Sequence, residues 1–80
     1  MSTSPPEISY SLSEAVAAEI RAEIARRGLR RPAFAASIGV PPHWLTNRLN
    51  GSVSINLEDL DRIAVGLGLN PNELLARADR

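Results

Sequence analysis

The sequence has no cysteine and only one histidine, and aromatic residues make up 4% of it. Without cysteine the chain has no disulfide scaffold, no thiol nucleophile and no cysteine zinc site. No carboxylate lies within one helical turn of the lone His43, so we expect no metal and no cofactor. No apolar run approaches the roughly 18 residues that span a bilayer, and the N-terminus lacks the basic and then apolar order of a secretory signal. We therefore expect a cytoplasmic protein that makes no contact with a membrane.

Lysine is also absent, and all nine basic residues are arginines, which suits bidentate contacts with phosphates or bases. The formal net charge is zero, yet residues 21–50 contain six arginines and a single acidic residue, Glu23. A segment with this excess of positive charge concentrates an anionic partner, although an ordinary solvated surface is the alternative. The arginines of the segment are Arg21, Arg26, Arg27, Arg30, Arg31 and Arg48.

At 80 residues the chain is long enough for one small domain and too short for two. Residues 1–9 are rich in serine and proline, which predicts a flexible tail, and residues 10–80 are expected to form the domain. A first helix is predicted over residues 12–27, where Ser11 and Glu14 have the spacing of a capping box and Tyr10 is placed to pack across it. Its apolar residues recur every four positions; they are Leu12, Val16, Ile20 and Ile24.

Four further helices are expected, because prolines or asparagines mark their starts and glycines mark most of their ends. They are residues 32–38, residues 42–49, residues 57–67 after an Asn56 cap, and a fifth helix from Asn70-Pro71. No strand-like alternation competes with them, so the chain is predicted to be all-α. The residues expected to face inward in the fourth helix are Leu57, Leu60, Ile63, Ala64 and Leu67.

The two short helices on either side of Gly39 have the lengths and the tight turn of a helix-turn-helix. Glycine permits the positive φ of such a turn, and the small Ala35 lets the helices approach closely. Leu45 is spaced to pack back against Phe34 and Ile38. A plain α-helical hairpin would show the same core, so this spacing alone leaves both interpretations open.

Over residues 12–75 the chain resembles the phage-repressor and Cro-like helix-turn-helix family, also called the xenobiotic-response-element family. The resemblance implies a compact five-helix domain of the lambda-repressor-like DNA-binding type and a sequence-specific regulator of transcription. The residues on which it rests are Gly28-Leu29, Phe34-Ala35, Ile38-Gly39-Val40, Leu45, Asn50-Gly51, Leu57, Leu60, Ile63, Ala64, Leu67-Gly68 and Glu73-Leu74-Leu75.

The resemblance further implies that residues 42–49 form the recognition helix, which lies in the major groove of double-stranded DNA. The positions that would face the bases are Pro42, His43, Thr46 and Asn47. Asn47 can pair with adenine in a bidentate manner, Thr46 can donate a hydrogen bond or present its methyl group, and Pro42 offers only apolar contact. His43 can contact a base or remain solvated.

Phosphate contacts are expected at the start of the second helix and around the end of the third. The second and third helices begin without a Ser, Thr, Asp or Asn cap, which leaves their first amides open to phosphate, or to water as the alternative. Trp44 is expected along the sugar-phosphate edge. The predicted phosphate contacts are Arg30, Arg31, Trp44, Arg48, Asn50, Gly51 and Ser52.

The sequence departs from the family at three places. The loop over residues 52–56 lacks the basic residues that many relatives carry, which predicts a modest affinity per domain. Many relatives have an ion pair where Ile24 and Leu49 stand here, which predicts an apolar contact in its place. Arg48 stands where relatives usually have an apolar residue, so either its stem covers the core with the guanidinium at the surface, or the third helix is rotated and Arg48 reaches a phosphate.

The expected partner is a palindromic DNA operator, bound by a homodimer because one small domain with few phosphate contacts would bind weakly. Leu69, Leu74 and Leu75 are candidates for the dimer surface, or they complete the core. The alternatives are a protein-interaction module such as an antirepressor, and an antitoxin-type regulator with a protein partner. The sequence has no acid–base pair, nucleophile–base set or glycine-rich phosphate loop, so we expect neither an enzyme nor a small-molecule ligand.

Overall fold

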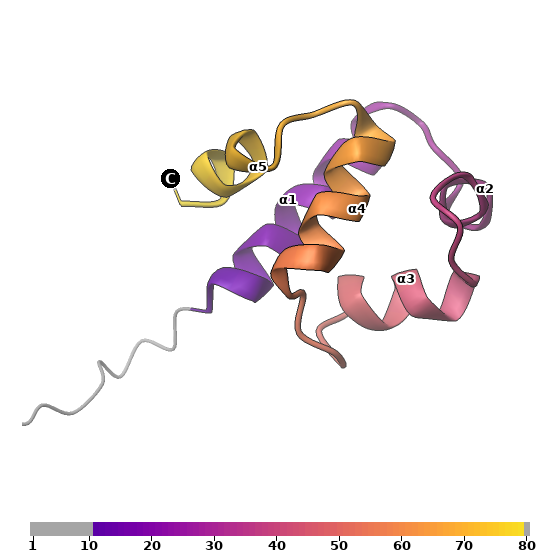
Figure 1. The fold of residues 1–80 in the computed structure, drawn as a ribbon, viewed down its shortest axis with the longest axis horizontal. Helices are drawn as coiled ribbons and strands as arrows, with labels where there is room; N and C mark the ends of the chain where they lie inside the picture. Colours follow the sequence, from indigo (N-terminus) through magenta and orange to yellow (C-terminus); the bar gives the residue numbers. More distant parts are fainter. Residues whose placement is uncertain (1–10, 80) are drawn as a thin grey trace, which may run out of the picture.

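The computed structural model describes residues 11–79, which form five α-helices (Figure 1). The predicted all-α class is confirmed, and the predicted boundaries agree with the structure to within one residue. None of the helices in this part of the chain is long and apolar enough to cross a bilayer. The helices are α1 (Leu12–Arg26), α2 (Arg31–Ser37), α3 (Pro42–Leu49), α4 (Leu57–Leu67) and α5 (Pro71–Ala78).

The helices pack around one hydrophobic core. Helix α1 packs against α5 and α3, α2 packs against α3, and α4 packs against α5. Figure 1 shows α5 at one end of the domain and the α2–α3 pair at the other. The core residues are Val16, Ile20, Ile24, Phe34, Ala35, Leu45, Leu49, Leu60, Ile63, Ala64, Leu67 and Leu74.

The helix starts follow the signals in the sequence. The Ser11 hydroxyl accepts a hydrogen bond from the Glu14 amide at 3.3 Å, whereas Tyr10, predicted to pack across this cap, lies outside the described residues. Asn56 and Asp59 form a full capping box at the start of α4, because each side chain accepts a bond from the other's backbone amide. The predicted tail over residues 1–9 also lies outside the described part.

Two leucines predicted to face inward are exposed instead. Leu12 is 46% exposed and Leu57 is 78% exposed. Both are the first residues of their helices. The apolar pattern of each helix extends to this first residue, but no described element packs over the hollow between the two leucines. The hollow is lined by Leu12, Ser13, Val16, Ile55, Asn56, Leu57, Leu60 and Leu75.

Helix α4 also supports α2 through a glycine within the helix. A Cβ at Gly66 would overlap Cγ2 of Ile38 and would lie 3.1 Å from Cε1 of Phe34. The missing side chain therefore lets α2 lie close against α4, which offsets the unfavourable helix propensity of glycine.

Candidate nucleic-acid interface

The turn between α2 and α3 is built around Gly39, which has a φ of +78°. The amide of Val40 donates to the carbonyl of Ala35 at 3.0 Å, and the amide of Gly39 donates to that of Ala36 at 3.1 Å. This pair of bonds is a Schellman motif, which requires the left-handed conformation that glycine adopts without strain. Ala35 is fully buried, so the close approach of α2 and α3 predicted from its small side chain is confirmed.

Helix α3 presents one polar side to solvent and buries the other. Leu45 and Leu49 are fully buried, whereas Pro42, His43 and Thr46 are exposed. The fourth position predicted to contact bases is Asn47, which is half-buried. Its backbone carbonyl accepts a hydrogen bond from the Val53 amide at 3.1 Å. The outer surface of α3 is therefore open over its first turn and flanked by the following loop near Asn47.

Helices α2 and α3 both begin without a side-chain cap among the described residues. The caps are Arg30 and Pro41, and each helix has a proline in its first turn. In α3 the amide of Trp44 already donates to the carbonyl of Pro41 at 3.0 Å, so α3 offers fewer open amides than the sequence suggested. Arg30 and Arg31 are both exposed at the start of α2.

The end of α3 brings together Asn50, Gly51 and Ser52. The Asn50 side chain accepts a bond from the Ser52 amide at 2.9 Å, which shapes the turn. Arg21 of α1 donates to the carbonyl of Leu49 and shares a hollow with Asn50 and Gly51. No signal in the sequence places Arg21 near the predicted phosphate contacts, because it is 28 residues from Leu49 along the chain.

Arg48 lies on the side of α3 that faces α4. Its Nε donates to the carboxylate of Asp59 at 3.0 Å, and its guanidinium carbon lies 4.1 Å from the centre of the Trp44 ring. Nη1 donates to the carbonyl of Trp44 at 3.2 Å. The structure thus places the Arg48 stem along the domain with its charge paired inside it, and a phosphate contact by Arg48 stays a prediction.

This arrangement of two short helices is matched by known proteins. The helix-turn-helix domain family matches residues 15–78. The chain belongs to the helix-turn-helix domain family. The comparison with curated proteins gave no match.

Solved structures with similar folds include regulators of transcription. Two crystal structures of the clp gene regulator ClgR from Corynebacterium glutamicum match with a TM-score of 0.80 each, at 26% and 27% identity. The first match covers 88% of this chain and 91% of ClgR, and the second covers 92% and 77%. The hypothetical transcription factor NHTF from Neisseria has the same fold, with 21% identity, a TM-score of 0.74, and coverage of 91% of this chain and 86% of that one. These findings support a DNA-binding transcriptional regulator.

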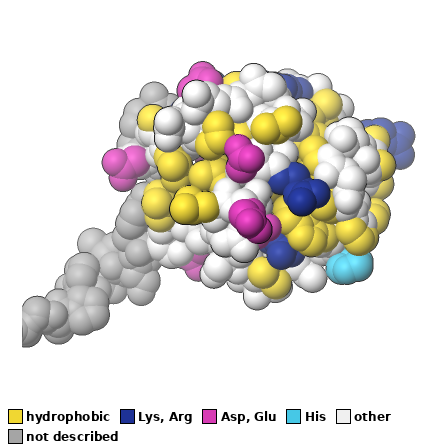
Figure 2. All heavy atoms as spheres, in the orientation of Figure 1, with side chains coloured by type: hydrophobic (Ala, Val, Ile, Leu, Met, Phe, Trp, Pro, Cys, Tyr) yellow, Lys and Arg dark blue, Asp and Glu magenta, His cyan; other side chains and the backbone are white. Residues whose placement is uncertain are grey.

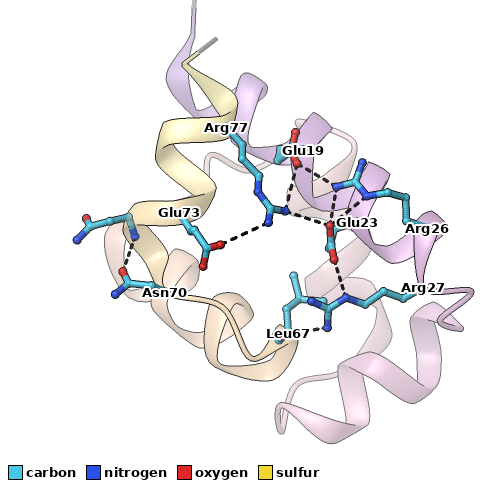
Figure 3. A network of polar contacts seen from close by, with 9 residues as sticks. Glu19, Glu23, Arg26, Arg27, Leu67, Asn70, Glu73 and Arg77 are labelled. Atoms are coloured by element: carbon cyan, nitrogen blue, oxygen red, sulfur yellow. Dashed lines mark hydrogen bonds and ion pairs between the residues drawn. The ribbon is translucent and has the colours of Figure 1, made fainter.

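Not all arginines of the basic segment are available to this helix-turn-helix. Arg26 and Arg27 both donate to the carboxylate of Glu23, at 2.5 Å and 2.6 Å, and Arg77 of α5 donates to it at 3.1 Å (Figure 3). Hydrogen bonds from Arg26 and then Arg27 lower the pKa of Glu23 from about 4.5 to about 2, although burial opposes the shift. The Glu23 network is completed by Glu19, Glu73 and the carbonyl of Leu67.

The remaining charges are distributed unevenly over the helix-turn-helix domain. In the view of Figure 2, the visible acidic side chains lie on the side of α5 and in the middle of the domain, and arginines lie from the middle toward the side of α2 and α3. Arg30 and Arg31, which have no ion pair among the described residues, lie at the start of α2. The arginines of the basic segment without an ion pair among the described residues therefore include two at the start of α2, the helix that precedes the turn into α3.

Proposed function

We propose that this helix-turn-helix protein is a sequence-specific regulator of transcription, of the Cro-like or short-repressor kind, that acts on DNA in the cytoplasm by binding without catalysis. In this proposal α3 lies in the major groove and α2 lies across the DNA backbone. The observation that supports it most directly is the exposure of Pro42, His43 and Thr46 on a short helix fixed by the buried Leu45 and Leu49.

The proposed contacts divide into two kinds. Bases are read by Thr46 and Asn47 through hydrogen bonds, with His43 and Pro42 at the start of the helix. Phosphates are bound by Arg30 and Arg31 at the uncapped start of α2, since positive side chains and open amides at a helix start attract anions, and by the side chains of the turn after α3. Arg21 is added to the phosphate contacts, because it lies beside Asn50 and Gly51.

We also propose that the protein binds a palindromic operator as a homodimer. Leu74, one of the leucines considered for the dimer surface, is fully buried in the core, and Leu69 and Leu75 pack partly against it. One apolar surface that remains exposed is the hollow around Leu12 and Leu57, which Leu75 also lines. Burial of these exposed leucines in a second copy would support such a dimer.

Selection of bound fragments from a random pool of duplex DNA tests the whole proposal. The expected result is an enriched palindrome whose half-sites lie about one helical turn apart. Enrichment of a single half-site would remove the dimer from the proposal and leave the reading of sequence intact. Failure to bind any duplex at about 50 mM salt would favour a protein-interaction module instead.

Replacing Arg31 with alanine is expected to weaken binding to all DNA sequences alike. The side chain is exposed at the start of α2, where it would contact a phosphate and not a base. The slope of log affinity against log salt concentration should fall by about one unit. Titrations of operator and random duplex over about 50–200 mM salt measure it, with Arg62→Ala in α4 as the matched control. Unequal losses on the two duplexes would contradict a phosphate contact.

Replacing Asn47 with alanine is expected to cost about 1–3 kcal/mol at one base pair of the operator and to relax the preference there. The reason is the loss of an amide that pairs with a base edge. Binding to operators that vary at each position in turn measures it. Asn72→Ala, an exposed asparagine in α5, should leave every preference unchanged. Equal losses on operator and random DNA would show that Asn47 does not face the bases.

A further inference from the structure

Asp59 is a buried acidic side chain that the proposed DNA contacts do not use. It is 7% exposed, and aspartate is seldom buried unless it is paired. One carboxylate oxygen, Oδ2, accepts a bond from the Asn56 amide at 3.2 Å and one from Nε of Arg48 at 3.0 Å. The first bond caps α4, and the second joins α4 to α3.

The guanidinium of Arg48 is held in three ways. Besides the bond to Asp59, Nη1 donates to the carbonyl of Trp44 at 3.2 Å, and the guanidinium carbon lies 4.1 Å from the centre of the Trp44 ring. The Arg48 side chain is only 16% exposed. Charge-assisted hydrogen bonds and cation–π contacts are each stronger in such a partly desolvated place. Trp44, Arg48 and Asp59 therefore form one unit, which we name the Arg48 cluster.

The Arg48 cluster links α3, which carries the proposed base-contacting side chains, to α4. Helix α3 has eight residues, and a helix of two turns has little stability of its own. Arg48–Asp59 is the only ion pair that joins α3 to α4 within residues 11–79. Arg48 directly follows Asn47 and stands two residues after Thr46. Since each residue turns a helix by about 100°, fixing Arg48 fixes the directions of both side chains.

We propose that Asp59 is a positioning residue for sequence recognition. It holds Arg48 and, through Arg48, the ring of Trp44, and it thereby sets the rotation of α3 about its axis without touching DNA. This inference rests on the proposed function. The competing assignment, in which Arg48 leaves Asp59 to bind a phosphate, predicts the opposite effect of removing the carboxylate.

Asp59→Asn is the test, with Asp61→Asn on the same helix as the control. Both variants remove one negative charge, and Asp61 is exposed, so the control measures the general effect of charge on DNA affinity. Relative to the control, Asp59→Asn is expected to bind the operator about tenfold more weakly, the effect of one charged hydrogen bond. Affinity for random duplex and its salt slope should equal those of the control.

A second readout does not depend on DNA. Trp44 is the only tryptophan, so tryptophan fluorescence reports on the surroundings of this one ring, which include the Arg48 guanidinium. Acrylamide is expected to quench it more efficiently in Asp59→Asn than in Asp61→Asn. If the wild-type protein binds no duplex, the proposed function fails. If quenching in Asp59→Asn equals that in Asp61→Asn, Asp59 does not hold the Trp44 ring through Arg48, and this part of the proposal is overturned whatever the DNA result.

The double variant Arg48→Met/Asp59→Asn keeps the test decisive if the single variant unfolds, because it leaves no unpaired charge in the cluster. We expect the same loss on the operator as in the single variant and no loss on random duplex, since residues of one unit are not additive. Two results would overturn the proposal. One is an operator affinity of Asp59→Asn equal to that of the control. The other is tighter binding to random duplex with a steeper salt slope, which would assign Arg48 to a phosphate.

Discussion

Replacement of Leu49 with alanine is expected to lower the free energy of unfolding by about 2–5 kcal/mol. Leu49 is the last residue of α3 and is fully buried. Its side chain belongs to the core that also includes Ile24 of α1 and Leu60 of α4. Truncation removes apolar contacts and leaves a cavity that α1, to which α3 is packed, cannot fill without moving. A small domain has a total stability of about 5–15 kcal/mol, so this one change removes a large part of it.

Urea unfolding followed by circular dichroism measures the effect, and Leu57→Ala is the matched control. Leu57 is also a leucine near a helix end, but it is 78% exposed. Its replacement should change the stability by less than about 0.5 kcal/mol. A large loss for Leu57→Ala that grows with protein concentration would show burial in a dimer. Equal and concentration-independent losses for the two variants would contradict the core assignment.

Leu49 also shows how far the sequence alone could predict this fold. The departure from the family at Ile24 and Leu49 predicted an apolar contact, and both side chains are buried in the same core. The helix ends were predictable because their signals are local: Asn56 caps α4, and Gly68 ends it with a φ of +71°. The turn at Gly39 was predictable for the same reason.

What the sequence could not predict depends on contacts between distant segments. Leu57 matches the apolar period of α4, yet whether anything covers its first turn is decided by the placement of α1. Arg21 reaches the end of α3 only because the two helices pack together. The bonds of Arg26 and Arg27 to Glu23 span three and four residues. This spacing favours ion pairs on helices, so these two pairs were predictable from the sequence. The bond from Arg77 to Glu23 was not predictable, because the two residues are 54 positions apart along the chain.

Replacing Glu23 with glutamine is expected to destabilise the protein strongly at neutral pH. Glu23 is only 8% exposed, and its carboxylate accepts bonds from Arg26, Arg27 and Arg77. It thereby joins α1 to α5, and Arg27 extends the network to α4 through the Leu67 carbonyl at 2.6 Å. Without the carboxylate, three guanidinium groups remain close together, with Glu19 and Glu73 at the edges of the network to balance them. Glu23 is the buried member of this set, so loss of its charge leaves three partly exposed arginines without their shared carboxylate.

The effect should depend on pH in a defined window. The pKa of Glu23 is lowered to about 2 by the hydrogen bonds from Arg26 and Arg27, from an ordinary value of about 4.5. Since the folded state holds the proton less tightly than the unfolded state, the carboxylate contributes its full stability above about pH 4.5. That contribution is lost as the pH falls from there toward 2. Wild type and Glu23→Gln should therefore differ most at neutral pH and become similar near pH 2.

Urea midpoints of the two proteins between pH 7 and pH 2, at constant salt, measure this convergence. Glu14→Gln is the matched control, because Glu14 lies on the same helix and is exposed. At pH 7 the midpoint of Glu23→Gln should fall by several times the shift seen in the control. A difference between wild type and Glu23→Gln that stays constant from pH 7 to pH 2 would mean that packing of the side chain, and not its charge, holds α5 to α1. In that case the three arginines would be bound by their other partners, and the ion-pair account of this joint would be wrong.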